Sequence, residues 1–238
     1  MLLPRSLHID THNNTTIRFS RLDNVKELIS KPFFDDCKFS NDDKLVVDIV
    51  DKFDAVPDLF IFHKGRCGST LVAHILQTLP KTIVFKEPAV FVIWCQTVFQ
   101  TQEQRRKVLR ILLAHFTNAA RRQGFCRVVF KFTSYLLRMI HDFTSVCPQT
   151  HSMYITRNTA DVLRSNILRP PSYVQNNTNT TPNITRLNTH SHTLSYIYDQ
   201  DDIGQSCCAR TLTYEHDILG PHCVHTILSA ARVHPLPK

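Results

Sequence analysis

The segment from Leu59 to Leu76 constrains the fold of this chain more than any other. An apolar run, Leu59–Phe62, leads into a short basic loop and then into an amphipathic stretch, Leu71–Leu76. Strand, tight loop and helix is the arrangement that presents backbone N–H groups and a helix N-terminus to an anion. The chain has only 5 Gly, and Gly65 and Gly68 both lie in this loop, which indicates a need for positive φ or close backbone approach. The loop does not match G-x-x-x-x-G-K-[ST], so taken alone it fits either an anion site or a basic turn before a helix.

A second strand-like run, His151–Ile155, is followed by a loop and helix over Thr156–Asn166. With these residues the chain resembles the sulfotransferase family, which uses 3′-phosphoadenosine 5′-phosphosulfate (PAPS). The segment Arg66–Leu71 is similar to the family's 5′-phosphosulfate loop, a basic residue followed by x-Gly-[Ser/Thr]-Thr. Arg157 and Ser165 resemble the arginine and serine that hold the 3′-phosphate of the cofactor. The resemblance covers roughly residues 58–166, with a fainter similarity at residues 214–215.

The resemblance implies a PAPS site and a set of residues around it. The expected cofactor-binding residues are Lys64, Gly65, Arg66, Cys67, Gly68, Ser69, Thr70, Arg157 and Ser165. The position of Cys67, beside a basic residue and a helix start, predicts a lowered thiol pKa, although we expect its side chain to be structural rather than catalytic. The partners implied are the nucleotide cosubstrate and an acceptor whose identity the sequence does not give.

Sulfuryl transfer needs a general base near the acceptor and cations around the sulfate oxygens. Glu87, at the end of the strand that follows the loop, resembles the catalytic base of tyrosylprotein and carbohydrate sulfotransferases. The cytosolic branch carries Lys-Thr-His on the third strand, whereas this chain reads Lys131-Phe132-Thr133. We therefore expect Glu87 as the base, with His63 and His141 next in line, and Lys131 as a sulfuryl or phosphate contact. The alternative for Glu87 is a carboxylate at a helix N-terminus that pairs with Lys86 or with the helix dipole. The alternative for Lys131 is an ordinary lysine at a strand end.

Alternating apolar and amphipathic segments predict the fold. Strands are expected at residues 59–63, 82–85, 127–132, 152–156 and 211–214, and helices at 69–78, 89–99, 103–122, 134–145, 160–168 and 216–231. A short helix is also expected after Ser40. This order predicts an α/β fold with a central parallel β-sheet flanked by helices on both faces, and the resemblance implies the P-loop NTPase-like sulfotransferase fold. Ligands of such sheets bind at the carboxyl ends of the strands.

The domain organisation follows from composition. Residues 1–40 are polar and weakly periodic, so we expect an irregular N-terminal arm. Residues 41–238 are expected to form a single sulfotransferase-like domain. Within it, a segment at about 170–193 is rich in Asn and Thr and poor in large hydrophobic residues, which predicts a flexible insert.

Charge and cysteine content limit the classes of partner. A net charge of +8 fits an anionic ligand, but basic residues without interleaved aromatics argue against a nucleic-acid partner. No C-x-x-C pair and no full set of zinc ligands appears among the 8 Cys and 13 His, so no metal is expected. No apolar run of membrane-spanning length and no signal peptide is evident, which predicts a cytoplasmic protein.

Three functions remain open at this stage. The first is a PAPS-dependent sulfotransferase, and the second is an inactive, nucleotide-binding relative. The second stays open because the glycine-rich basic C-terminal loop of the cytosolic enzymes is not evident before Lys238. The third is another P-loop phosphotransferase, although no convincing magnesium-binding strand is found.

Overall fold

The computed structural model describes residues 1–9, 15–40, 46–47, 55–168, 210–213, 218 and 223–231. Its centre is a five-stranded parallel sheet in the order β5-β6-β4-β7-β8. The strands are β4 (Leu59–His63), β5 (Thr82–Lys86), β6 (Arg127–Lys131), β7 (His151–Thr156) and β8 (Arg210–Thr213). The helices around it are α2 (Ser69–Gln77), α3 (Ala89–Gln96), α4 (Gln102–Arg122), η2 (Ser134–Met139), α5 (Ile140–Val146), α6 (Thr159–Leu168) and α9 (Cys223–Ala230). The predicted α/β class with a parallel sheet is confirmed.

The strands form where the sequence carries short, nearly continuous apolar runs. All residues of β4 and β5 are buried, as is typical of a parallel sheet covered by helices. Phe60 of β4 aligns with Phe130 of β6 on one side and with Ser152 of β7 on the other. Each strand differs from its predicted bounds by at most one residue at either end. The helix predicted over residues 134–145 is instead a 3₁₀ segment, η2, that continues into α5.

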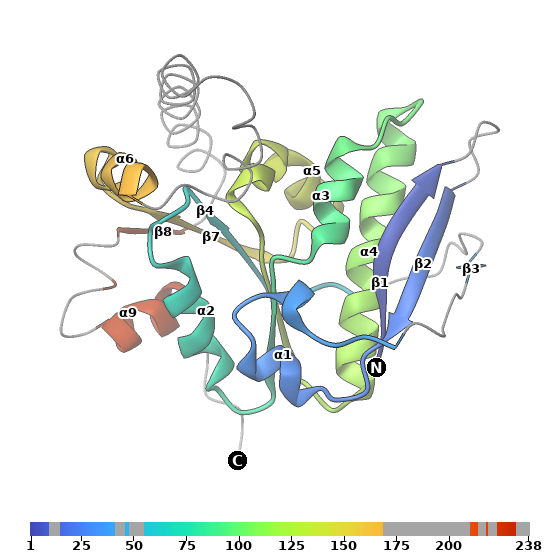
Figure 1. Ribbon diagram of the computed structural model, residues 1–238, viewed down its shortest axis with the longest axis horizontal. Coiled ribbons are helices and arrows are strands. Elements are labelled where there is room, and N and C mark those ends of the chain that lie inside the picture. Colours follow the sequence, from blue (N-terminus) through green and yellow to red (C-terminus); the bar gives the residue numbers. More distant parts are fainter. Residues whose placement is uncertain are drawn as a thin grey trace.

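Alternate side chains of each strand enter two separate cores. Phe60 and Phe62 pack with residues of α3, α4 and α5 on one face. Leu59 and Ile61 pack with residues of α2 and α9 on the other face. Figure 1 shows α2 and α9 on one side of the sheet and α3 and α4 on the opposite side. Helices therefore cover both faces, and the carboxyl edge of the sheet is where the strand-to-helix loops lie.

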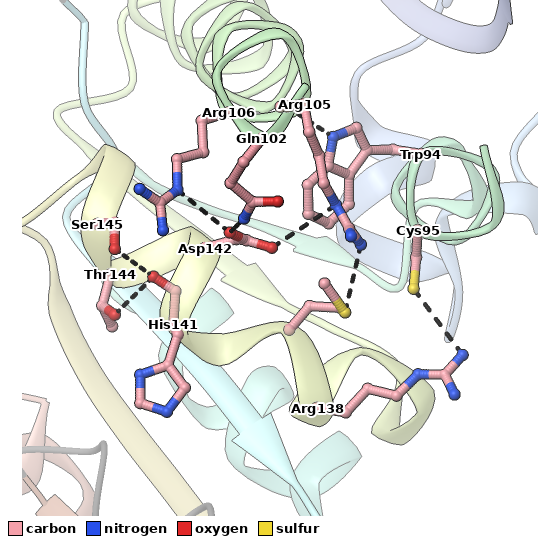
Figure 2. A network of polar contacts seen from close by, with 11 residues as sticks. Trp94, Cys95, Gln102, Arg105, Arg106, Arg138, His141, Asp142, Thr144 and Ser145 are labelled. Carbon is pink, nitrogen blue, oxygen red and sulfur yellow. Dashed lines mark hydrogen bonds and ion pairs between the residues drawn. The ribbon is translucent and has the colours of Figure 1, made fainter. Parts of the chain in front are cut away.

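A buried carboxylate fastens α4 to α5 (Figure 2). Asp142 accepts a hydrogen bond from Gln102 Nε2 at 2.6 Å and one from Arg106 Nε at 3.3 Å. Arg105 Nε lies 3.6 Å from the second oxygen of Asp142, and its guanidinium lies over the ring of Trp94 at 4.8 Å. A buried charge needs such partners, so this network is structural.

The N-terminal segment is not irregular, contrary to the prediction. It forms β1 (Leu2–Ile9) and β2 (Thr15–Arg21), which pair antiparallel, followed by α1 (Lys26–Ser30) and η1 (Phe34–Asp36). Leu3 and Phe19 are buried in the same core as Phe60, and β1 packs against α3 and α4. The prediction failed because the bulge between Pro4 and Ser6 interrupts the alternation that identifies a strand.

Some predictions on the remaining segments are wrong and others are not tested. The helix expected after Ser40 is wrong where the structure describes it, because Val46–Val47 form β3 and pair with β2. The Asn/Thr-rich insert at 170–193 and residues 214–215 lie outside the described residues. In the described part, no helix is long and apolar enough to cross a membrane.

Candidate active site

The carboxyl edge of the sheet gathers the predicted site residues from four adjacent strands. β4 ends at His63 and β7 at Thr156, so the loops that follow them start side by side. Lys131, the last residue of β6, aligns with Lys86 of β5 and with Ile61 of β4. Glu87 follows Lys86 directly, and its N–H donates to Lys131 O at 2.7 Å.

The β4–α2 loop, residues 64–68, turns sharply before the helix. Gly65, Arg66 and Gly68 have φ angles of +85°, +51° and +77°, and Gly68 is the N-cap of α2. Left-handed backbone suits glycine but strains arginine, and such strain is frequent at functional sites. The Arg66 side chain is exposed, so a basic group and a helix N-terminus lie at the same turn. This combination attracts anions.

Cys67 does not have the lowered thiol pKa that the sequence predicted. Its side chain is fully buried against the α2 core. Burial raises the pKa of the Cys67 thiol to about 11, although backbone N–H groups and the Lys131 charge oppose the rise. The thiol is therefore unreactive near neutral pH, and only the backbone of Cys67 is available to a ligand.

The β7–α6 loop is joined to the β4–α2 loop by two basic side chains. Lys64 is buried, and its Nζ donates to Thr159 Oγ1 at 2.7 Å and to Arg157 O at 3.5 Å. Arg157 Nη1 in turn donates to Arg66 O at 3.2 Å. The two predicted phosphate elements are thus held next to each other.

The residues that follow Arg157 in the sequence form the start of α6. Asn158 Oδ1 accepts the N–H of Ala160 at 2.9 Å, which is the bond of an N-cap. Asp161 lies in the first turn, where a carboxylate suits the helix dipole, and Val162 is buried. Ser165, half-buried on the same helix, lies about two helical turns beyond Arg157.

Glu87 and Lys131 form an ion pair at the carboxyl ends of β5 and β6. Lys131 is buried, and its Nζ lies 5.6 Å from the ring centroid of Phe33. The Glu87 side chain is 23% exposed, and its Oε1 lies 3.6 Å from His63 Nε2. Glu87 also has a left-handed backbone, with φ +57°. A strained, partly exposed carboxylate beside two nitrogen groups has the position expected of an acid–base residue.

The electrostatics of this cluster favour an ionised Glu87. Burial opposes ionisation, but the contacts with His63 and the Lys131 ammonium outweigh it and lower the pKa of Glu87 to about 2. Burial and the Lys131 charge lower the pKa of His63 from its ordinary value. At neutral pH the cluster therefore holds a carboxylate, an ammonium and a neutral imidazole.

The contacts of two residues in this region, Lys86 and His63, were not predicted from the sequence. Lys86 does not pair with Glu87, because its Nζ donates to Ile29 O at 3.2 Å and to Lys31 O at 2.7 Å and so fastens the end of α1 to β5. The sequence suggested His63 only as a second choice for the general base. In the structure, its Nδ1 accepts the N–H of Gly65 at 3.0 Å. Its position as the last residue of the strand before the loop was the available signal.

Comparisons with known proteins add little to the geometry. No family model matches this sequence, and no curated protein matches it. Among solved structures, the chain is similar to a sulfotransferase from Alicyclobacillus acidocaldarius, with 15% sequence identity and a TM-score of 0.48. The match covers 76% of this chain and 82% of that chain. So distant a similarity leaves the function to the residues of the site.

Proposed function

We propose that the protein transfers a sulfuryl group from PAPS to a hydroxyl or amine acceptor. The observation that carries the proposal is the position of an ionised carboxylate and a buried ammonium, Glu87 and Lys131, next to a basic helix-initiating loop. That loop is joined through Arg157 to a second basic loop. One anion site thus adjoins a second, with an acid–base pair beside them, as a nucleotide with two phosphate groups and a reacting sulfuryl group requires.

The nucleotide would be held by the two loops. Arg66 and the N–H groups of Gly68, Ser69 and Thr70 bind the 5′-phosphosulfate at the start of α2. Arg157 and Ser165 bind the 3′-phosphate, the arginine through two parallel hydrogen bonds. Lys64 contributes by holding the β7–α6 loop in place, since its ammonium bonds Thr159 Oγ1.

Bound PAPS supplies the sulfuryl group: the acceptor oxygen or nitrogen bonds to sulfur while the bond from sulfur to the phosphate oxygen breaks, leaving adenosine 3′,5′-bisphosphate. Glu87 takes the proton that the acceptor loses. Lys131 lies where its charge can stabilise the negative charge that develops on the sulfuryl and phosphate oxygens. An oxygen that binds Lys131 also weakens the ion pair and makes Glu87 a stronger base.

The test is turnover of radiolabelled PAPS with 4-nitrophenol, a tyrosine-containing peptide or N-acetylglucosamine as acceptor. We expect the wild-type protein to release adenosine 3′,5′-bisphosphate and to label at least one acceptor. Glu87→Gln should lower this turnover by about 10²–10⁴-fold with little change in nucleotide affinity. Glu103→Gln, which changes an exposed carboxylate on α4, is the matched control.

Each alternative function has its own outcome in this assay. Nucleotide binding without turnover of any acceptor would contradict sulfuryl transfer and favour an inactive relative. Turnover of ATP in place of PAPS would indicate a phosphotransferase. Full activity of Glu87→Gln would show that another group accepts the proton.

A further inference from the structure

His63 lies between the β4–α2 loop and the Glu87–Lys131 pair. It is the last residue of β4, and its side chain is only 6% exposed. The strand before it is apolar, so a histidine at this buried position requires polar groups that its ring nitrogens can contact. Its two ring nitrogens face different parts of the site: Nδ1 meets the loop, and Nε2 lies near Glu87.

The hydrogen bond at Nδ1 fixes the tautomer of the ring. Because Nδ1 accepts the Gly65 N–H at 3.0 Å, it carries no proton. A neutral imidazole then bears its single proton on Nε2. Burial and the Lys131 charge lower the pKa of His63, which keeps the ring neutral. His63 therefore presents an Nε2–H donor on the side where Glu87 lies.

Among the described residues, no acceptor lies within ordinary hydrogen-bond distance of that donor. His63 Nε2 is buried without a hydrogen-bond partner, and its separation from Glu87 Oε1, 3.6 Å, is longer than a hydrogen bond. A buried donor without an acceptor is unfavourable. A small movement of the strand end or of Glu87 would join the two groups.

We propose that His63 is a positioning residue that couples the nucleotide-binding loop to the general base: its Nδ1 holds the Gly65 N–H, and its Nε2–H binds and orients Glu87 when the loop is loaded. The inference rests on the proposed function. It assigns His63 no proton transfer, since Nδ1 is occupied by a donor and Nε2 already carries a proton. His63 is thereby removed from the candidates for the base.

Two substitutions separate the two ends of the ring. His63→Asn places an amide oxygen near the position of Nδ1, so it keeps the acceptor for Gly65 and loses the donor for Glu87. His63→Gln places an amide nitrogen near the position of Nε2, so it keeps the donor and loses the acceptor. His8→Gln, an exposed histidine on β1, is the matched control.

We expect opposite effects from the two variants. His63→Asn should lower kcat by about 10–100-fold, the change expected when a hydrogen bond to a charged group is lost, and leave the affinity for adenosine 3′,5′-bisphosphate unchanged. His63→Gln should keep most of kcat and bind the nucleotide more weakly. A merely structural role would change both quantities together in both variants.

Nitrogen NMR of the imidazole gives a readout that needs no acceptor. We expect the neutral Nε2–H tautomer with and without adenosine 3′,5′-bisphosphate, and a titration at lower pH than that of an ordinary histidine, because burial and the Lys131 charge lower the pKa of His63. A protonated Nδ1, or wild-type kcat in His63→Asn beside normal nucleotide binding, would overturn this inference alone. A wild-type protein that binds no nucleotide would overturn the proposed function and this inference with it.

Discussion

At the scale of single residues, the Glu87 carboxylate is held by contacts that also limit its strength as a base. The Lys131 ammonium and the nearby His63 stabilise the charged form and outweigh the cost of burial, so the pKa of Glu87 falls to about 2. A carboxylate with so low a pKa accepts a proton poorly. The proposed role of Glu87 as a base therefore requires a ligand that competes for Lys131. The ion pair also contributes stability that is lost in acid.

The sign of this stability contribution follows from the direction of the shift. A depressed folded-state pKa adds stability above the ordinary value of 4.5 and loses it as the pH falls towards 2. The contribution at neutral pH is of the order of 3 kcal/mol. We expect urea unfolding to show that wild type loses more stability between these pH values than Glu87→Gln does, since other carboxylates act equally in both. Parallel pH profiles would show that the ion pair has no such effect.

The Glu87–Lys131 pair could be predicted in part from the sequence. Both residues lie at strand ends, and parallel strands present their carboxyl ends at one edge. The sequence could not predict which lysine pairs with Glu87, because Lys86 and Lys131 are aligned neighbours. Only the fold shows that the ammonium of Lys86 donates to backbone carbonyls at the end of α1. The orientation of His63 also depends on the left-handed turn at Gly65.

At the scale of elements, the site depends on the contact between the β4–α2 and β7–α6 loops. Lys64 looks like a phosphate ligand in the sequence, but the neighbouring position of β7 brings Thr159 within 2.7 Å of its ammonium. Most strands and helices could be predicted because apolar runs and amphipathic periods are local signals. Contacts between loops are long-range, so the bond between Lys64 and Thr159 could not be predicted.

Lys64→Met should loosen the start of α6. The variant removes the bonds to Thr159 Oγ1 and Arg157 O and keeps the aliphatic length of the side chain. We expect faster amide exchange over residues 157–162, equivalent to about 1.5–3 kcal/mol for a hydrogen bond from a charged group. Lys26→Met, at an exposed position of α1, is the control. Unchanged exchange in the Lys64 variant would mean that the two loops are held by other contacts.

At the scale of the whole molecule, the N-terminal hairpin is part of the main core. Leu3 and Phe19 belong to the same apolar cluster as the sheet residues Phe60 and Phe130, and the hairpin packs against α3 and α4. The hairpin was not predicted from the sequence, because Pro4 and the polar residues of β1 obscure the alternation of buried and exposed side chains. The division into an N-terminal arm and a domain over 41–238 stays a prediction.

Phe19→Ala should therefore destabilise the protein as a core substitution does. Phe19 is 3% exposed and packs edge-on against His115 at 4.8 Å. We expect a loss of about 3–5 kcal/mol in the free energy of unfolding, measured with denaturant. Val98→Ala, at a side chain 90% exposed, should change stability by less than about 0.5 kcal/mol. A Phe19 variant as stable as the Val98 variant would contradict the role of the hairpin in the core.

The central claim, that the two loops form a site for a nucleotide with a 3′-phosphate, is tested most directly by calorimetry. Adenosine 3′,5′-bisphosphate, adenosine 5′-monophosphate and ATP are titrated into the wild-type protein and into Arg157→Ala. We predict that wild type prefers the 3′,5′-bisphosphate and that Arg157→Ala loses this preference, by about 1.5–3 kcal/mol for a charged hydrogen-bonded contact. Equal affinity of wild type for all three nucleotides, or a preference for ATP, would contradict the account.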